Sequence, residues 1–157
     1  MNDASRTDRE WKEILTTHEY EVTRKGGTEP PFSGALYLED RTGSYFCICC
    51  NHLLFTSEMK FDSGCGWPSF HTEHSQAGIR RLIDRKYGMV RVEVRCGSCD
   101  AHLGHVFEDG PRKFGGERYC INSVSMSFKE SDADDEENKK MGRNGYWAQG
   151  AEPQKQV

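Results

Sequence analysis

The sequence has no long apolar run, no basic block and no stretch that resembles a signal peptide. No segment approaches the ~20 apolar residues that a membrane-spanning helix needs, and residues 1–20 contain no apolar core. The basic residues are scattered, with no cluster longer than Arg80-Arg81, and the formal net charge is −4. We therefore expect a soluble, cytoplasmic protein that has neither nucleic acid nor a membrane as its partner.

Helical signals are also scarce, and they are confined to the N-terminal region. Thr7 with Glu10, and Thr16 with Glu19, each fit the capping box that begins a helix. Further along, short β-type runs alternate with glycine-rich turns, at residues 45–48, 53–55, 79–83, 89–95, 103–107 and 119–128. This pattern predicts a mainly β, antiparallel core with short N-terminal helices.

The chain of 157 residues is long enough for one domain with tails. We expect an N-terminal tail over residues 1–7, one domain over residues 8–128 and a C-terminal tail over residues 129–157. The last segment is first strongly acidic and then rich in glycine and polar residues, which is typical of a solvated tail. We find no functional motif in it.

Cysteine, by contrast, is plentiful: the chain has seven, and two pairs have the spacing C-x-x-C. In a reducing compartment this pattern favours metal binding or redox chemistry over a disulfide framework. Cys47, Cys50, Cys96 and Cys99 suit one tetrahedral zinc ion with a structural role, because no coordination position stays open. Iron, or two separate redox motifs, are the alternatives. Cys49 is too close to Cys47 to be a ligand, and we interpret it as a small core residue.

Cys65 and Cys120 remain. Cys65 lies between two glycines beside Trp67, and such a loop suits a resolving cysteine that must reach another sulfur. Cys120 lies in an apolar β run, and Asn122 points to the same face of that strand. A thiol and an amide on one rigid surface suit a nucleophilic site. A buried core cysteine explains the spacing of Cys120 equally well.

His102 and His105 follow directly after the second cysteine pair. A metal loop would hold an imidazole rigidly, which suits a proton donor. The alternative is that both are core histidines bonded to backbone carbonyls. We expect His18, His71 and His74 to be surface residues.

Four segments closely resemble the type B methionine sulfoxide reductases, which reduce the R epimer of methionine sulfoxide. They are residues 27–32, 61–70, 95–107 and 118–123 (GTEPPF, FDSGCGWPSF, RCGSCDAHLGHVF and RYCINS). The resemblance covers about residues 8–128 and keeps the family's order. It implies two antiparallel sheets with small N-terminal helices, and a structural zinc ion where both C-x-x-C pairs are present. Cys49 and the tail lie outside the recognised pattern.

The resemblance also implies a role for each site residue. Cys120 is similar to the family's nucleophile, Cys65 to its resolving cysteine and Trp67 to the wall that meets the substrate S-methyl group. The sulfoxide oxygen would be held by three polar side chains: His102, His105 and Asn122. The implied cycle forms a Cys120 sulfenic acid and then a Cys65–Cys120 disulfide, which a thioredoxin-type reductant reopens. We expect oxidised methionine in peptides and proteins as the main substrate.

Two other classes of protein fit parts of the sequence. A zinc-ribbon-like binding module would use the four-cysteine site and give Cys65 and Cys120 no role. It would also need a basic or aromatic surface, which the sequence does not show. A redox sensor would form the same disulfide without turning over a substrate, and only sulfoxide turnover separates it from the enzyme. We expect the enzyme.

Overall fold

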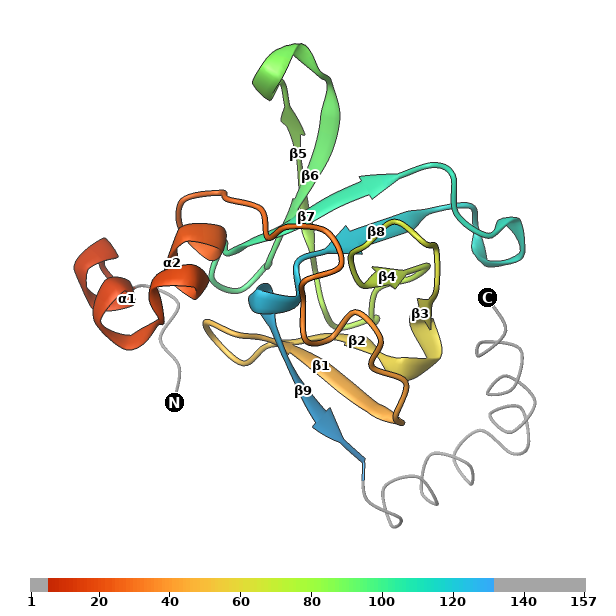
Figure 1. Ribbon diagram of the computed structural model, residues 1–157, viewed down its shortest axis with the longest axis horizontal. Helices are drawn as coiled ribbons and strands as arrows, with labels where there is room; N and C mark the ends of the chain where they lie inside the picture. Colours follow the sequence, from red (N-terminus) through yellow and green to blue (C-terminus); the bar gives the residue numbers. More distant parts are fainter. Residues whose placement is uncertain (1–5, 132–157) are drawn as a thin grey trace.

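Two antiparallel sheets and two short helices make up the fold of residues 6–131, which the computed structural model describes (Figure 1). The helices are α1 (Asp8–Ile14) and α2 (Thr17–Thr23). The smaller sheet has the order β2 (Leu53–Thr56), β1 (Gly43–Cys47), β9 (Met126–Glu130). The larger has the order β3 (Lys60–Phe61), β4 (Ser69–Phe70), β8 (Arg118–Ile121), β7 (His102–Phe107), β6 (Arg91–Arg95), β5 (Arg80–Asp84). The predicted fold class is confirmed.

Both helices begin at the predicted capping boxes. Thr7 Oγ1 accepts the N–H of Glu10 at 3.2 Å, and the Glu10 carboxylate accepts the N–H of Thr7 at 2.9 Å. Thr16 and Glu19 form the same reciprocal pair. Each helix has only seven residues, which is too short to be stable alone in water. Burial of side chains such as that of Trp11 in the common core therefore stabilises them.

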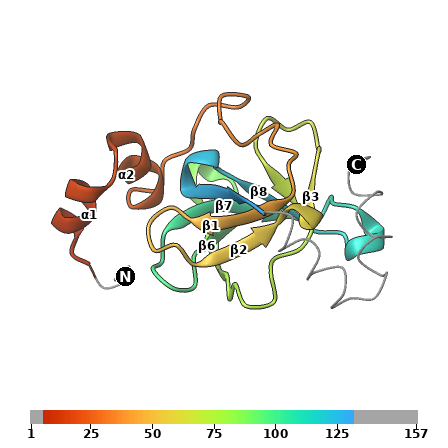
Figure 2. The same ribbon diagram turned by 90° about the horizontal axis from the view of Figure 1, so that it is seen from below.

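Aromatic rings join the two sheets at the core. Phe55 of β2 stacks on Phe70 of β4 with ring centroids 4.0 Å apart, and Tyr45 of β1 meets the same ring edge-on at 5.1 Å. All three side chains are fully buried. Burying one such ring contributes roughly 1.5–3 kcal/mol, so this cluster is a main source of stability. The view turned by 90° shows the smaller sheet lying across the larger one (Figure 2).

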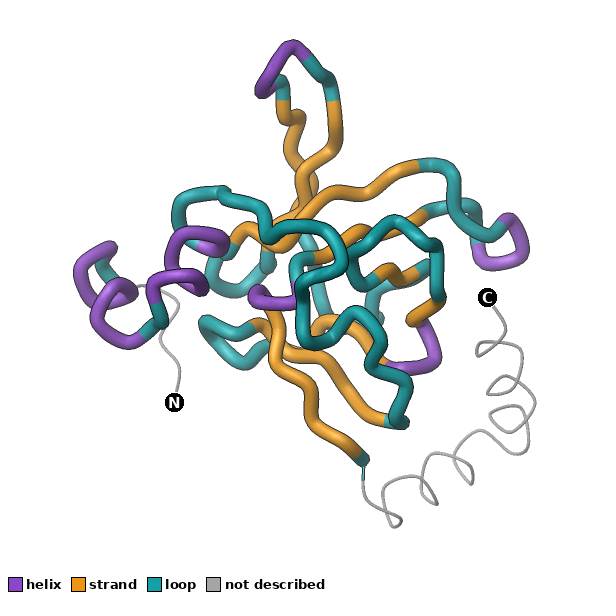
Figure 3. Tube along the Cα trace, viewed as in Figure 1, coloured by secondary structure: helices purple, strands orange, loops and turns teal. Residues whose placement is uncertain are grey.

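The predicted run at residues 119–128 is two strands, not one. Between β8 and β9 a 3₁₀ turn, η4 (Ser123–Ser125), carries the chain from the larger sheet to the smaller (Figure 3). The Glu29 carboxylate accepts the N–H of Ser123 at 2.9 Å and that of Val124 at 3.0 Å. These bonds replace the strand ladder at this point. Their acceptor lies about 94 residues away in sequence, so the local pattern did not reveal the break.

A β-bulge in β7 decides where its histidines point. Gly104 pairs with Val94 and His102 with Arg95, so Leu103 is an extra residue in this strand. Residues three apart normally face opposite sides of a sheet. The bulge puts His102 and His105 on the same face, with ring centroids 5.7 Å apart.

His71 corrects one prediction, because only 6% of its surface is exposed. Its ring stacks on Phe114 of the turn η3 (Arg112–Phe114) with centroids 3.7 Å apart. Burial lowers the pKa of His71 from 6.5 to about 4. The segment is polar in sequence, and its aromatic partner lies too far along the chain to be predicted. His18 is exposed, as predicted, and His74 is half-buried.

The buried imidazole of His71 predicts a stability that falls as the pH decreases from about 6.5 to about 4. Between these pH values the unfolded chain binds a proton at this imidazole and the folded protein does not. The stability loss is therefore absent above pH 6.5, the unfolded pKa, and complete below about pH 4. It amounts to at most about 3 kcal/mol. His71→Phe keeps a flat ring, and its urea unfolding should lose most of this pH dependence. An unchanged pH profile would contradict the assignment.

Among residues 6–131, no helix is long and apolar enough to span a membrane. β9 extends to Glu130, so the chain is still part of the smaller sheet just beyond the predicted domain end. The rest of the predicted tail, residues 132–157, lies outside the described residues.

Candidate active site

A small cavity of about 170 Å³ lies on one face of the larger sheet, over β6, β7 and β8. Antiparallel register places His105 opposite Cys120 and Phe107 opposite Arg118, so alternate residues of β7 and β8 form its floor. Arg91 of β6 extends this wall. The remaining lining residues come from loops or follow a strand: Thr28, Cys65, Trp67 and Asn122. The cavity thus brings together five of the six residues predicted for the reaction.

Close packing of β7 against β8 fixes the position of Cys120. A Cβ atom at Gly104 would lie 2.0 Å from the Cys120 carbonyl oxygen, so only glycine fits there. This contact holds the predicted nucleophile on a rigid strand rather than on a loop.

The two cavity thiols face each other, with Cys65 Sγ 3.7 Å from Cys120 Sγ. Cys65 is also within 3.4 Å of the Ser69 hydroxyl and of the Trp67 carbonyl. A disulfide has an S–S distance of about 2.05 Å, so the sulfurs need to approach by about 1.7 Å to form one. The movement expected of the Cys65 loop is therefore short.

A hydrogen bond between the two sulfurs couples their ionisation. The hydrogen bond from the Cys120 thiol lowers the pKa of Cys65 to about 4. The same bond, together with burial, raises the pKa of Cys120, and the Arg118 guanidinium opposes that rise. The bond between the sulfurs therefore favours the ionised form of one thiol of the pair at a time. A nucleophilic Cys120 requires its own proton to move to Cys65 or to leave the pair.

Asp84 orients the imidazole of His105. The Asp84 carboxylate lies 2.8 Å from His105 Nε2 and accepts the N–H of Lys86 at 3.0 Å. These hydrogen bonds hold the pKa of Asp84 at about 2. Burial lowers the pKa of His105, although Asp84 opposes this. His105 is therefore neutral at pH 7 with Nε2–H donating to Asp84, and Asp84 stabilises the imidazolium whenever a proton arrives.

The amide of Asn122 is fixed by two backbone groups. Its Oδ1 accepts the N–H of Glu29 at 3.0 Å, and its Nδ2 donates to the Leu103 carbonyl at 3.0 Å. A primary amide has two N–H groups, so one remains for a ligand. Asn122 lines the cavity while only 3% of its surface is exposed.

His102 lies beside His105 rather than among the residues that line the cavity. Its Nδ1 is 2.6 Å from a carboxylate oxygen of Glu93. Burial opposes the ionisation of Glu93, but hydrogen bonds from His102 and Arg95 outweigh it and hold the Glu93 pKa at about 2. His102 instead lines a separate hollow of about 260 Å³. Its predicted contact with the sulfoxide oxygen stays a prediction.

Glu29 was missed by the sequence reasoning, although it connects two predicted site residues. Only 1% of its surface is exposed. Its backbone N–H holds Asn122, its carbonyl accepts Trp67 Nε1–H at 3.0 Å, and its carboxylate accepts two N–H groups of η4. The only signal was an acidic residue directly before Pro30-Pro31, where a loop residue would usually be exposed.

Glu29→Ala should lower the free energy of unfolding by about 2–4 kcal/mol, because it leaves one buried and one partly buried N–H group without an acceptor. Glu29→Gln keeps one acceptor oxygen and should cost about half as much. Urea unfolding measures both. Ser33→Ala, in the same loop, removes only an exposed hydrogen bond and is the control. A Glu29→Ala protein as stable as this control would show that Glu29 does not hold the loop.

The four predicted metal ligands converge on one point. The sulfurs of Cys47, Cys50, Cys96 and Cys99 all lie within 4.8 Å of one another, and two pairs are 3.6 Å apart. Tetrahedral zinc with Zn–S bonds of about 2.3 Å needs sulfurs about 3.8 Å apart. The donor set and spacing therefore fit zinc. The site joins the turn after β1 to the turn after β6, and so connects the two sheets.

Cys49 takes no part in this cluster. It is buried, and its thiol lies 3.3 Å from the Thr23 hydroxyl of α2. This agrees with its interpretation as a small core residue. His52, whose Nε2 bonds to the backbone carbonyls of Gln76 and Ala77, is likewise not a ligand.

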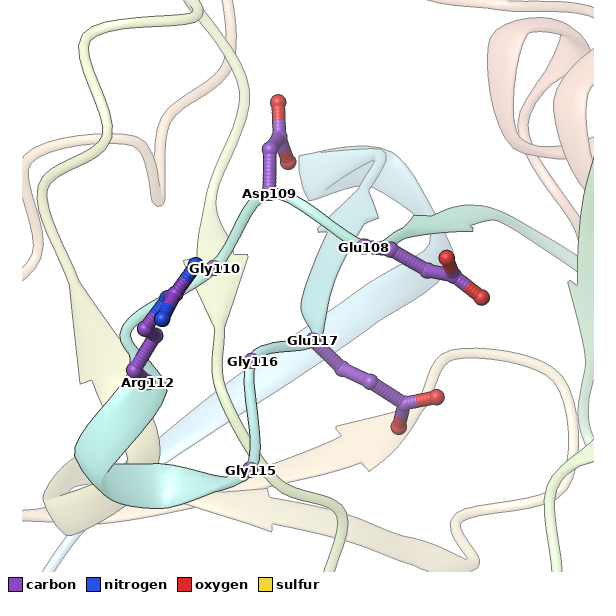
Figure 4. Close-up of a pocket in the computed structure, with 7 residues that line it drawn as sticks. All are labelled: Glu108, Asp109, Gly110, Arg112, Gly115, Gly116 and Glu117. Carbon is purple, nitrogen blue, oxygen red and sulfur yellow. The ribbon is translucent and has the colours of Figure 1, made fainter.

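A larger, shallower hollow lies over the loop between β7 and β8. Figure 4 shows the carboxylates of Glu108 and Glu117 on one side of this loop and the side chain of Arg112 on the other. Asp109 pairs with Arg118 at 2.8 Å. The lining consists of charged side chains and glycine backbone and contains no thiol. The smaller cavity is therefore the better candidate for redox chemistry.

One cavity thus contains a facing thiol pair, a histidine bound to an aspartate and a tryptophan, and a separate four-cysteine centre lies elsewhere in the fold. These features define a thiol-dependent oxidoreductase of the two-sheet β class. A family model described as the SelR domain matches residues 15–130. The chain is 50% identical to the peptide methionine sulfoxide reductase MsrB of Hahella chejuensis over 134 residues, which cover 85% of this chain and 96% of the relative. The chain therefore belongs to the type B methionine sulfoxide reductases.

Two further relatives are also named as methionine sulfoxide reductases. Peptide methionine sulfoxide reductase MsrB of Herminiimonas arsenicoxydans is 54% identical over 123 residues, 78% of this chain and 89% of the relative. The probable methionine-R-sulfoxide reductase B of Caenorhabditis elegans is 52% identical over 124 residues, 78% of this chain and 82% of the relative. The resemblance stated from the sequence motifs is confirmed.

Proposed function

We propose that this protein reduces the R epimer of methionine sulfoxide in peptides and proteins to methionine. The observation that carries the proposal is the pair of thiols 3.7 Å apart in a cavity that also presents Trp67, His105 and Asn122. Membership of the family and the names of its members support the substrate class and the epimer.

The first step is attack by the Cys120 thiolate on the sulfoxide sulfur. Arg118 favours the thiolate, and the indole of Trp67 offers an apolar wall for the S-methyl group. The Trp67 ring is held by its hydrogen bond to the Glu29 carbonyl. A nucleophile on a strand beside a fixed wall can attack from one side only, which agrees with selection of one epimer.

The sulfoxide oxygen must gain hydrogen bonds and a proton as the S–O bond breaks. The remaining N–H of Asn122 is one donor, and His105 in its imidazolium form, stabilised by Asp84, is the other. Attack forms a transient bond between Cys120 Sγ and the substrate sulfur. The protonated oxygen then passes from the substrate sulfur to Cys120 Sγ, and both the substrate S–O bond and the transient S–S bond break. Methionine is released and Cys120 becomes a sulfenic acid, so Cys120 is oxidised by two electrons and the sulfoxide is reduced by two. We place His102 behind His105, as a residue that acts through its neighbour.

The Cys65 thiol then attacks the sulfenic acid. An S–S bond forms, the S–O bond breaks and water leaves. A thioredoxin-type dithiol reopens the disulfide by thiol exchange, which restores both cysteines and oxidises the reductant. The short distance between the two sulfurs supports this resolving step.

Zinc is the metal that we propose for the four-cysteine centre, with Cys47, Cys50, Cys96 and Cys99 as its ligands. When bound, it supplies structural cross-linking and no open coordination position. Arg24 of the α2 C-cap donates to the Cys99 carbonyl at 2.8 Å and lies 3.7 Å from its sulfur, so the helices also pack onto this centre. We propose the cytoplasm as the location, because free thiols persist there.

The native protein with dithiothreitol should reduce the R epimer of methionine sulfoxide in a capped peptide and leave the S epimer untouched. The measurement is chromatography of the two resolved epimers before and after incubation. Turnover of the S epimer alone would contradict the epimer assignment. Absence of turnover by zinc-loaded, reduced protein would favour a binding module or a redox sensor.

A further inference from the structure

The hairpin of β5 and β6 presents apolar side chains that the proposed chemistry does not use. It projects from the rest of the fold, with the 3₁₀ turn η2 (Lys86–Gly88) at its tip (Figure 1). Four large apolar residues in it are exposed: Ile83 by 59%, Tyr87 by 86%, Met89 by 45% and Val90 by 68%. Exposed apolar residues that gather in one place mark interaction sites more often than single scattered ones do.

Tyr87 has a backbone conformation that its packing does not explain. Its φ of 59° and ψ of 29° lie in the left-handed region, which costs a bulky side chain on the order of 1 kcal/mol or more. Glycine or asparagine would adopt this turn at lower cost. The tyrosine ring is nevertheless almost fully exposed. The turn at the hairpin tip needs two consecutive left-handed residues, Tyr87 and Gly88, but it does not need a tyrosine.

The base of the same hairpin forms part of the cavity. Arg91 lines the cavity and lies 3.4 Å from the carboxylate of Asp84, which in turn binds His105. Leu82 and Asp84 lie on one face of β5, and the register pairs Asp84 with Arg91 on the same face of β6. Met89 lies just before β6 and has an extended backbone, so we assign it to the face of Arg91. The side of the hairpin that carries Leu82 and Met89 therefore continues the cavity wall outward, while Val90 and Ile83 lie on its other side.

The cavity has room for one side chain and little more. Its volume is about 170 Å³, whereas pockets for drug-sized ligands occupy roughly 300–1,000 Å³. A methionine sulfoxide within a polypeptide must therefore leave its neighbours outside, against the rim. Methionine belongs to the residues that are most often buried, and its oxidation disrupts cores. Strands and helices that face a core repeat apolar residues every two to four positions, so apolar residues are common within a few positions of such a methionine in sequence.

We propose that the cavity side of the hairpin, formed by Leu82 and Met89 with Tyr87 at its tip, binds the apolar residues that flank a methionine sulfoxide in an unfolded protein segment. This inference rests on the proposed function and adds the polypeptide partner to it. It makes the hairpin a specificity element for unfolded over folded substrates, because a folded chain keeps such neighbours buried.

The test uses the double variant Tyr87→Asn, Met89→Gln, which removes apolar surface while asparagine tolerates the left-handed turn. The substrates are a synthetic peptide with one central R-methionine sulfoxide between leucine and valine residues, and the capped amino acid N-acetyl-methionine-R-sulfoxide methylamide. With dithiothreitol as reductant, KM for the peptide should rise roughly five- to ten-fold with kcat unchanged. Both constants for the capped amino acid should stay the same.

The matched control is Val90→Thr, which is nearly isosteric and lies beside Met89 on the opposite face of the hairpin. This control should change neither KM nor kcat for either substrate. An unchanged KM for the peptide in the double variant would overturn the proposal, and so would an equal rise of that KM in the control. Turnover of the capped amino acid in the same experiment would still uphold the proposed enzyme activity. If the double variant raised only the KM for a thioredoxin-type reductant, the surface would be assigned to that reductant, and the proposal would again be overturned. No turnover of the capped amino acid by the native protein would overturn both.

Discussion

Cys120→Ser is expected to lower sulfoxide turnover with dithiothreitol by roughly a thousand-fold or more. A serine hydroxyl does not ionise near neutral pH and cannot replace the thiolate in attack on the sulfoxide sulfur. Loss of a nucleophile has cost other enzymes up to about 10⁶ in kcat. The side chain is half-buried and close to the size of serine, so the fold should persist. The measurement is the rate of R-sulfoxide consumption, with circular dichroism as a check on folding.

Cys65→Ser separates the nucleophile from its partner. This variant should keep most of its activity with dithiothreitol, a small thiol that can attack the sulfenic acid directly, and should lose turnover with a thioredoxin-type reductant. Mass spectrometry of the native protein after one turnover without reductant should find a Cys65–Cys120 disulfide. Full activity in Cys120→Ser together with none in Cys65→Ser would reverse the two assignments.

Removal of the metal is expected to lower the free energy of unfolding by at least about 4 kcal/mol. A ligand present at a thousand times its dissociation constant stabilises the folded state by that amount, and structural zinc binds tightly. The four thiols also lose their common partner when the ion leaves. Metal analysis should find about one zinc per chain, and urea unfolding with and without a chelator measures the effect.

The metal prediction has a control within the chain. Cys96→Ser should lose the zinc and the stability together, whereas Cys49→Ala, at a buried cysteine outside the cluster, should retain the zinc. A well-folded native protein without metal, or one that contains iron, would refute the assignment of zinc. Equal metal loss in both variants would mean that Cys49 belongs to the site.

The sequence was sufficient for what depends on local pattern. Alternating apolar residues predicted most strands within one or two residues, and the capping boxes at Thr7 and Thr16 predicted both helix starts. Cysteine spacing predicted the four sulfurs that converge. These signals are local because strand alternation, capping and ligand pairs each involve residues only a few positions apart.

What was missed depends on contacts between distant segments. Asp84 and Glu93, the carboxylates that bind the two histidines, lie 21 and 9 residues before them. Glu29 lies 93 residues before the asparagine that it holds. Each is one acidic residue among 25 aspartates and glutamates, and apart from the two prolines after Glu29 nothing in the neighbouring sequence distinguishes them. Only the register of the sheets and the course of the N-terminal loop select these three.

The bulge at Leu103 limits how this chain can vary in length. Because of the bulge, His102 lies on the same face of β7 as His105, which is itself opposite Cys120. Deleting one residue within β7 would turn one end of the strand over, because a shift by one residue exchanges its two faces. Insertions and deletions in this family should therefore be absent from β7 and be found instead in the loop that follows it.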